Sequence, residues 1–180
     1  NISKLNYAFC DRINFNELLL WDTRNVVTTQ YMFYNCIKFN KPLENWIMTN
    51  VNYINSMFSF CRNFNQPLNN WDVQNVKSTN WMFHKCLNFN QPLNKWNTKN
   101  LQSTEHMFNE CKLFNQSLEN WNVSNVIYMN DMFASCYVFN QPLEKWNMKN
   151  VKNIDGIFRC CYVFNQPLNN WDVSNIISMY

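Results

Sequence analysis

The chain has 180 residues, a formal net charge of +3 and 47% hydrophobic residues. Its lysines and arginines are scattered one or two at a time, which argues against a nucleic-acid partner or an anionic membrane surface. No apolar run approaches the roughly 20 residues that a membrane-spanning helix needs, so we expect no membrane insertion by this segment.

A repeat of constant length runs through the sequence. The repeat is marked by equally spaced tryptophans at Trp21, Trp46, Trp71, Trp96, Trp121, Trp146 and Trp171. Self-similarity at a fixed period predicts units that stack, each covering the apolar face of its neighbour. We therefore predict one repeat domain over residues 1–180. Because the sequence opens and closes within a repeat, we also expect it to be a fragment of a longer chain.

The first predicted element of each copy is a short helix. After Asn50, apolar residues recur at intervals of three and four, at Val51, Ile54, Met57, Phe58 and Cys61. This spacing predicts a helix of about ten residues with Asn50 as its N-cap. We expect the helix to end before Pro67, with Asn65 taking the left-handed conformation usually given to glycine.

The second predicted element is a short strand at Leu68, Trp71 and Val73, with the side chains of Trp71 and Val73 pointing inward. Repetition of the two elements predicts an α/β solenoid of about seven strand–turn–helix repeats, with a parallel sheet on one face. A parallel β-helix is the alternative, supported by a β-branched run in the first copy at Val26, Val27, Thr28 and Thr29.

The repeat carries a family resemblance in its pattern Leu-x-x-Trp-x-Val-x-Asn, followed by Met-Phe-x-x-Cys-x-x-Phe-Asn-Gln-Pro-Leu. This pattern resembles the 25-residue repeats of BspA-like leucine-rich-repeat surface proteins, the mycoplasma lipoprotein type that is also common in giant viruses. The resemblance implies a leucine-rich-repeat-like solenoid with a role in adhesion or recognition. It implies a location at the cell surface, outside the cell or on a virion. It brings no shared catalytic residue and no cofactor.

The cysteines also follow the period, at Cys36, Cys61, Cys86, Cys111, Cys136 and Cys161. Zinc ligands come in close pairs, so we predict no metal site and interpret the column as buried free thiols. A disulfide between cysteines of adjacent copies is the alternative interpretation. Cys10 and Cys160 fall in a separate column of mixed residues; they are either exposed thiols that could link to another chain or incidental cysteines.

Two further features have structural interpretations. The asparagine four residues after each Trp predicts a ladder in which side-chain amides bond the backbone of the neighbouring copy. Trp81 stands outside the tryptophan column and is expected at the surface. His84 and His106 are the only histidines, and no nucleophile with an orienting acid recurs near them, so we predict that the chain is not an enzyme.

The candidate binding residues are those that flank the predicted inward position of Val73, and its equivalent in each other copy, on either side. The first column contains Asp22, Ile47, Asp72, Asn97, Asn122, Asn147 and Asp172. The second contains Arg24, Thr49, Gln74, Lys99, Ser124, Lys149 and Ser174. We expect this outward strand face to bind a protein or glycan partner. The alternative is an architectural component that packs against identical copies in a viral particle or a cell-surface assembly.

Overall fold

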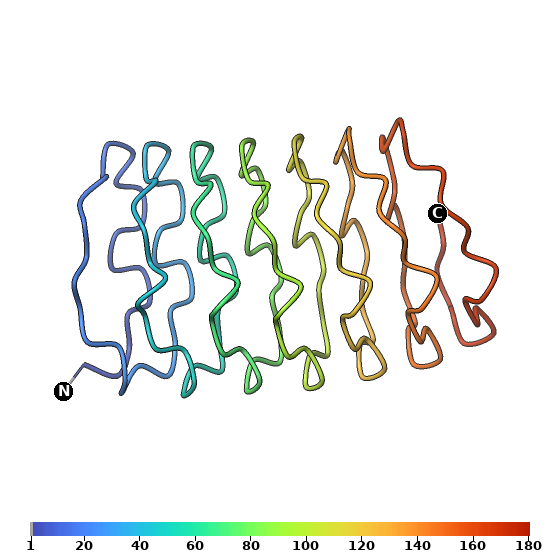
Figure 1. Cartoon of the computed structure of the whole chain (residues 1–180), viewed down its shortest axis with the longest axis horizontal. Helices are drawn as coiled ribbons and strands as arrows, with labels where there is room; N and C mark the ends of the chain where they lie inside the picture. The colour runs from blue at the N-terminus through green and yellow to red at the C-terminus, as the bar shows by residue number, and fades with distance from the viewer. Residues whose placement is uncertain (1) are drawn as a thin grey trace.

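A computed structural model describes residues 2–180 (Figure 1). Each copy of the repeat forms one elongated coil, and successive coils stack side by side along the long axis of the molecule. The two termini lie at opposite ends of the stack. Residues that are one period apart in the sequence are therefore neighbours in space.

The predicted α/β solenoid with a parallel sheet is wrong, and so is the leucine-rich-repeat secondary structure that the resemblance implied. Residues 2–180 contain no helix, and their regular pairing consists of isolated parallel bridges. The bridges connect single residues of successive coils at Lys4, Thr28, Tyr53, Ser78, Ser103, Tyr128, Asn153 and Ser178. The continuous strands of the alternative β-helix are also absent from the described residues.

Each coil is a succession of tight turns instead. In one copy, the amide of Met82 donates to the carbonyl of Thr79 at 3.0 Å, and that of Cys86 donates to Phe83 at 2.8 Å. Further turns of the same i to i−3 type close at His84, Phe89, Trp96 and Leu101. These turns place apolar residues on the inside at the spacing that was interpreted as helical.

The amides between the turn donors point to the next coil. Those of Thr79, Trp81, Phe83 and Lys85 donate to carbonyls of the following copy of the repeat, at 2.8 to 3.1 Å. In an α-helix each of these amides would bond within its own segment. Alternate amides thus close turns and bridge coils, which satisfies the backbone without a helix or a sheet.

Two residues of each coil have positive φ, and this also rules out a helix there. The first column contains Tyr7, Tyr31, Ser56, Trp81, His106, Asp131 and Gly156. The second contains Asp11, Asn35, Phe60, Lys85, Glu110, Ser135 and Cys160. Neither column holds a β-branched residue, which the left-handed region accepts least well. Asn65 is not among them, so its predicted left-handed conformation is wrong.

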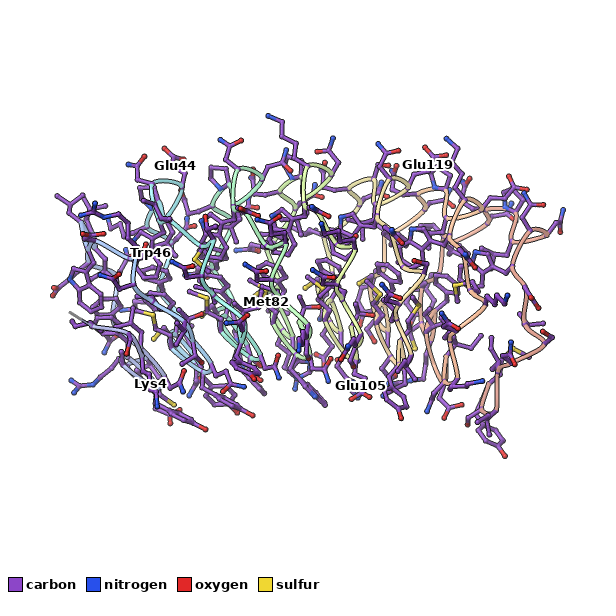
Figure 2. All side chains as sticks on the ribbon, turned by 90° about the horizontal axis from the view of Figure 1, so that it is seen from below. Lys4, Glu44, Trp46, Met82, Glu105 and Glu119 are labelled. Carbon is purple, nitrogen blue, oxygen red and sulfur yellow. The ribbon has the colours of Figure 1, made fainter. Side chains whose placement is uncertain are left out.

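The core is a set of aromatic stacks that run along the molecule. Phe58 and Phe83 stack with ring centroids 5.8 Å apart, and each also packs on a second phenylalanine of its own coil at 4.1 Å. Trp71 and Val73 point inward as predicted, with exposures of 2% and 1%. In Figure 2, Trp46 and Met82 lie between two polar edges, one carrying Glu44 and Glu119 and the other Lys4 and Glu105.

The first coil is one residue shorter than the others. The amide of Tyr7 bonds the carbonyl of Gln30, and the equivalent amide of Tyr31 bonds the carbonyl of Asn55. The separation between donor and acceptor along the chain is one residue longer for the second bond than for the first. Asp11, not Cys10, therefore occupies the second left-handed column together with Cys160. The expectation that Cys10 and Cys160 share a column is wrong, because it assumed an unbroken period.

Candidate binding surface

The predicted binding residues lie on rows of turns and not on a sheet, but all of them are exposed or half-exposed. We call these residues the turn surface. Its first column is Asp22, Ile47, Asp72, Asn97, Asn122, Asn147 and Asp172, and its second is Arg24, Thr49, Gln74, Lys99, Ser124, Lys149 and Ser174. Inward residues alternate with them as they would in a strand, which explains why their exposure could be predicted without the correct secondary structure.

Side chains of the first column fix the turn on which they sit. The Oδ1 atom of Asn122 accepts the amide of Ser124 at 3.0 Å, and Asp172 Oδ1 accepts the amide of Ser174 at 3.0 Å. This local bond from an Asp or Asn side chain to the backbone two residues later defines an Asx turn. Ile47 cannot make it, and its amide instead donates to the Thr23 hydroxyl at 2.8 Å.

The asparagine ladder fixes the second column to the next coil, as the sequence predicted. The side-chain amide of Asn100 donates to the carbonyl of Gln74 at 2.6 Å, and that of Asn125 donates to Lys99 at 2.7 Å. The same bond is made by Asn50, Asn75, Asn150 and Asn175. The predicted N-cap role of Asn50 is wrong, since no helix follows it.

The turn surface carries little net charge. Its three aspartates are matched by one arginine and two lysines. Asp22 and Arg24 form an ion pair at 2.7 Å, and the hydrogen bonds from Arg24 lower the pKa of Asp22 to about 2. Hydrogen bonds from Ser174 also lower the pKa of Asp172. Amides and hydroxyls make up most of the rest, so the surface suits neutral polar contacts better than a highly charged partner.

All eight cysteines are free thiols, and five of them are buried. The thiol of Cys86 donates to the carbonyl of Phe58 at 3.0 Å, and that of Cys111 donates to Phe83 at 2.9 Å. The interpretation of the column as buried free thiols is therefore confirmed for five of its six members, although these thiols also act as hydrogen-bond donors; Cys161 is partly exposed. Cys10 is partly exposed and Cys160 is exposed.

A second surface, which sequence reasoning missed, is formed by aromatic residues of the left-handed columns. Trp81 is 37% exposed, which confirms its predicted place at the surface. It borders a groove of about 250 Å³ with Tyr31, Tyr34, Phe60 and His84. The available signal was the alignment of Tyr31, Ser56, Trp81 and His106 at the repeat period, where aromatic rings replace polar residues.

Residues 2–180 contain neither a metal-binding cluster nor a membrane-spanning helix. No group of three His, Cys, Asp or Glu side chains is placed to hold a metal ion. Across the same residues, no helix is both long and apolar enough to cross a membrane.

These stacked coils, one for each copy of the sequence repeat, define a repeat protein. The sequence matches the family model described as "Mycoplasma protein of unknown function, DUF285" over residues 3–112 and again over residues 78–180. The two matches overlap and together cover nearly all of the sequence, so the chain belongs to this family. No curated protein and no solved structure matches it.

Proposed function

We propose that the chain is a non-enzymatic recognition module that binds a protein or glycan partner through the turn surface. The observation that carries this proposal is an exposed surface whose backbone is held in place by hydrogen bonds. Asx turns hold the first column, and the asparagine ladder holds the carbonyls of the second, while the side chains face solvent. A surface ordered before binding loses little conformational entropy when a partner docks.

The regular pitch of the columns favours an extended partner. Equivalent side chains recur once per coil along the whole stack, so a polymer or a flat protein surface can contact several coils at once. We also propose a relationship to the BspA-like surface proteins, on the basis of the repeat pattern. A location at the cell surface, outside the cell or on a virion follows from that proposal.

The test uses a glycan array and a panel of purified cell-surface and extracellular-matrix proteins as probes. Replacement of Asn97 and Asn122 by arginine adds two long, charged side chains in adjacent coils of the first column. We expect this double variant to lose at least ten-fold in affinity for any probe that binds the unmodified chain. Because Ile47 already stands in the same column without an Asx turn, the fold tolerates the loss of this turn.

The matched control replaces Asn63 and Asn88 by arginine. These two asparagines are exposed in adjacent coils, but they belong to another column. The control adds the same charge and should bind like the unmodified chain. Equal affinity of the Asn97/Asn122 variant, or equal loss in both variants, would refute recognition by the turn surface. Purification of the chain only as a many-copy particle that binds no probe would favour the architectural alternative.

A further inference from the structure

The groove beside Trp81 exists because a stack of rings is interrupted. In the first left-handed column, Tyr7 and Tyr31 stack with centroids 4.9 Å apart and an interplanar angle of 3°. Two coils further on, Trp81 and His106 stack at 3.7 Å and 16°. Between these pairs stands Ser56, whose side chain is too small to fill its place in the stack. We call the resulting gap the aromatic slot.

The walls of the slot are the rings of Tyr31 and Trp81. Each also packs with a second ring of its own coil, Tyr31 with Tyr34 at 5.9 Å and Trp81 with His84 at 4.8 Å. Since each ring is parallel to its outer partner, its other face turns toward the level of Ser56. The remaining lining consists of Ser56, Ser59, Tyr34, Phe60 and His84. The slot is therefore an apolar cleft with two hydroxyl groups and one imidazole along its inner side.

The His84 ring at the inner side of the slot is buried and uncharged. His84 is 7% exposed. Burial lowers the pKa of His84 to about 4, so the ring is neutral at pH 7.

The width of the slot selects the shape of its occupant. Adjacent coils lie about 4.8 Å apart where their backbones pair, so the backbones of Tyr31 and Trp81, two coils apart, are separated by roughly 10 Å. A flat ring in contact with both walls needs only about 7–8 Å, at about 3.5–4 Å per contact. A puckered sugar ring is thicker and presents C–H groups on both faces, with hydroxyl groups around its edge.

The charges at the rim disfavour a cationic occupant. The ammonium group of Lys85 lies 5.0 Å from the centroid of the Phe60 ring and is paired with Glu110 at 3.4 Å. A second cation would meet this ammonium group. We propose that the aromatic slot binds a neutral pyranose unit of a glycan, with its C–H faces between Tyr31 and Trp81 and its hydroxyl groups directed toward Ser56 and Ser59.

This site shares no residue with the turn surface and does not rest on the function proposed for that surface. Its test is a substitution that fills the slot, Ser56→Tyr. Tyr31 and Trp81 already occupy the same left-handed column with φ of 56° and 61°, so the backbone at Ser56 accepts a tyrosine. The matched control is Ser135→Tyr, which adds the same ring at a left-handed position three coils away.

The probe is an array of neutral oligosaccharides, followed by titration calorimetry with each sugar that binds. We expect Ser56→Tyr and Trp81→Ala to lose at least ten-fold in affinity. We expect Ser135→Tyr and the Asn97/Asn122 arginine variant to bind as the unmodified chain does. Thermal unfolding of every variant verifies that it is folded.

Three outcomes would overturn the proposal. The first is that no neutral sugar binds the unmodified chain. The second is that folded Ser56→Tyr binds as tightly as the unmodified chain. The third is that choline binds in the slot, shown by a loss of choline binding in Trp81→Ala. Choline that displaces the sugar, or that binds when no sugar does, would make the slot a cation site. Loss of sugar binding in the Asn97/Asn122 variant alone would instead assign the sugar to the turn surface.

Discussion

The cysteine column shows how burial and hydrogen bonding make a thiol inert. Cys61 is fully buried and donates to the carbonyl of Phe33 at 2.9 Å. Desolvation raises its pKa well above the ordinary value, so the reactive thiolate is not populated near neutral pH. Cys160, by contrast, is exposed to solvent.

We therefore predict a graded reaction with an aromatic disulfide reagent at pH 8. Cys160 should react first, and Cys10 should follow more slowly because desolvation and Asp11 raise its pKa. Cys36, Cys61, Cys86, Cys111 and Cys136 should react only after denaturation. Peptide mapping by mass spectrometry identifies the labelled residues. Protection of both Cys10 and Cys160 in the folded chain would contradict their assigned exposure.

The left-handed positions are a second feature of single residues. Ser135 has φ of 60°, a conformation that costs an L-residue with a Cβ atom about 1–2 kcal/mol. Glycine avoids that cost but loses roughly 0.5–1 kcal/mol more backbone entropy on folding. A β-branched side chain adds further crowding.

Two substitutions at Ser135 test this backbone geometry. Ser135→Gly should stabilise the chain by about 0.5 kcal/mol, and Ser135→Val should destabilise it by at least about 1 kcal/mol. Urea unfolding of the two variants and of the unmodified chain gives the order of stability. An order with valine above serine would show that the residue is not left-handed.

Gly156, the only glycine of the chain, combines this φ requirement with a lack of space. A Cβ atom there would approach Asp131 Oδ1 to 2.7 Å. Asp131 at this point accepts a hydrogen bond from Arg159 at 2.6 Å. Glycine therefore occurs where Asp131 of the neighbouring coil, paired with Arg159, lies against the backbone.

The buried histidine at the slot makes stability depend on pH. Desolvation is the main cause of the low pKa of His84; Lys85 and His106 lower it further, while Glu110 and the bond from Asn109 act in the opposite direction. The unfolded chain has a histidine pKa near 6.5, so it binds a proton more readily than the folded chain between pH 6.5 and 4.

Stability should consequently fall as the pH is lowered from about 6.5 to about 4, and His84 should cease to contribute to the slope below that range. We expect His84 to account for up to about 2 kcal/mol of the loss, allowing for partial solvent screening. His84→Asn, which introduces the residue found at the equivalent position of the next coil, Asn109, should reduce the slope of stability against pH. Chemical unfolding at several pH values measures it, and an unchanged slope would contradict the burial of a neutral His84.

At the scale of the element, side-chain ladders replace the sheet. The Oδ1 atom of Asn90 accepts the amide of Asn115 at 2.9 Å and the side-chain amide of Gln116 at 3.0 Å. Asn40, Asn65, Asn115 and Asn140 repeat this arrangement. The asparagine of the Phe-Asn-Gln-Pro segment therefore connects coils and does not end a helix.

Removal of one ladder side chain should have a cost that depends on its bonds. Asn90→Ala leaves two donors of the next coil without their acceptor, at about 1 kcal/mol each, so we expect a loss of about 2 kcal/mol. Asn88→Ala changes an exposed asparagine of the same coil and should stay within about 0.5 kcal/mol of the unmodified chain. Equal stabilities of the two variants by urea unfolding would refute the ladder.

These ladders also explain which elements could be predicted from the sequence. The intervals between Val51, Ile54 and Met57 fit one face of a helix, but consecutive tight turns bury the same residues. A helix and a series of tight turns differ in where alternate backbone amides donate their hydrogen bonds. Here these amides donate to another coil, and this does not affect the spacing of apolar residues. The inward direction of Trp71 was predictable because alternation alone determines it.

The whole molecule is a stack in which each coil depends on its neighbours. One contiguous core extends from Leu5 to Trp171, and the aromatic columns cross every coil boundary within it. Exposure of the turn surface could be predicted because it depends only on the alternation of inward and outward residues. The aromatic slot could not be predicted, since it arises from a small residue between the rings of two other coils. Its width depends on the distance between those coils.

The most direct test of recognition by a single chain is native mass spectrometry of the purified protein, alone and with a probe that binds it on the arrays. We expect a species of 21.9 kDa that gains the mass of one or more bound probe molecules. We expect the Asn97/Asn122 arginine variant to keep the free mass and lose the complex formed with a probe of the turn surface. Detection of the unmodified chain solely in large many-copy particles that take up no probe would contradict this function.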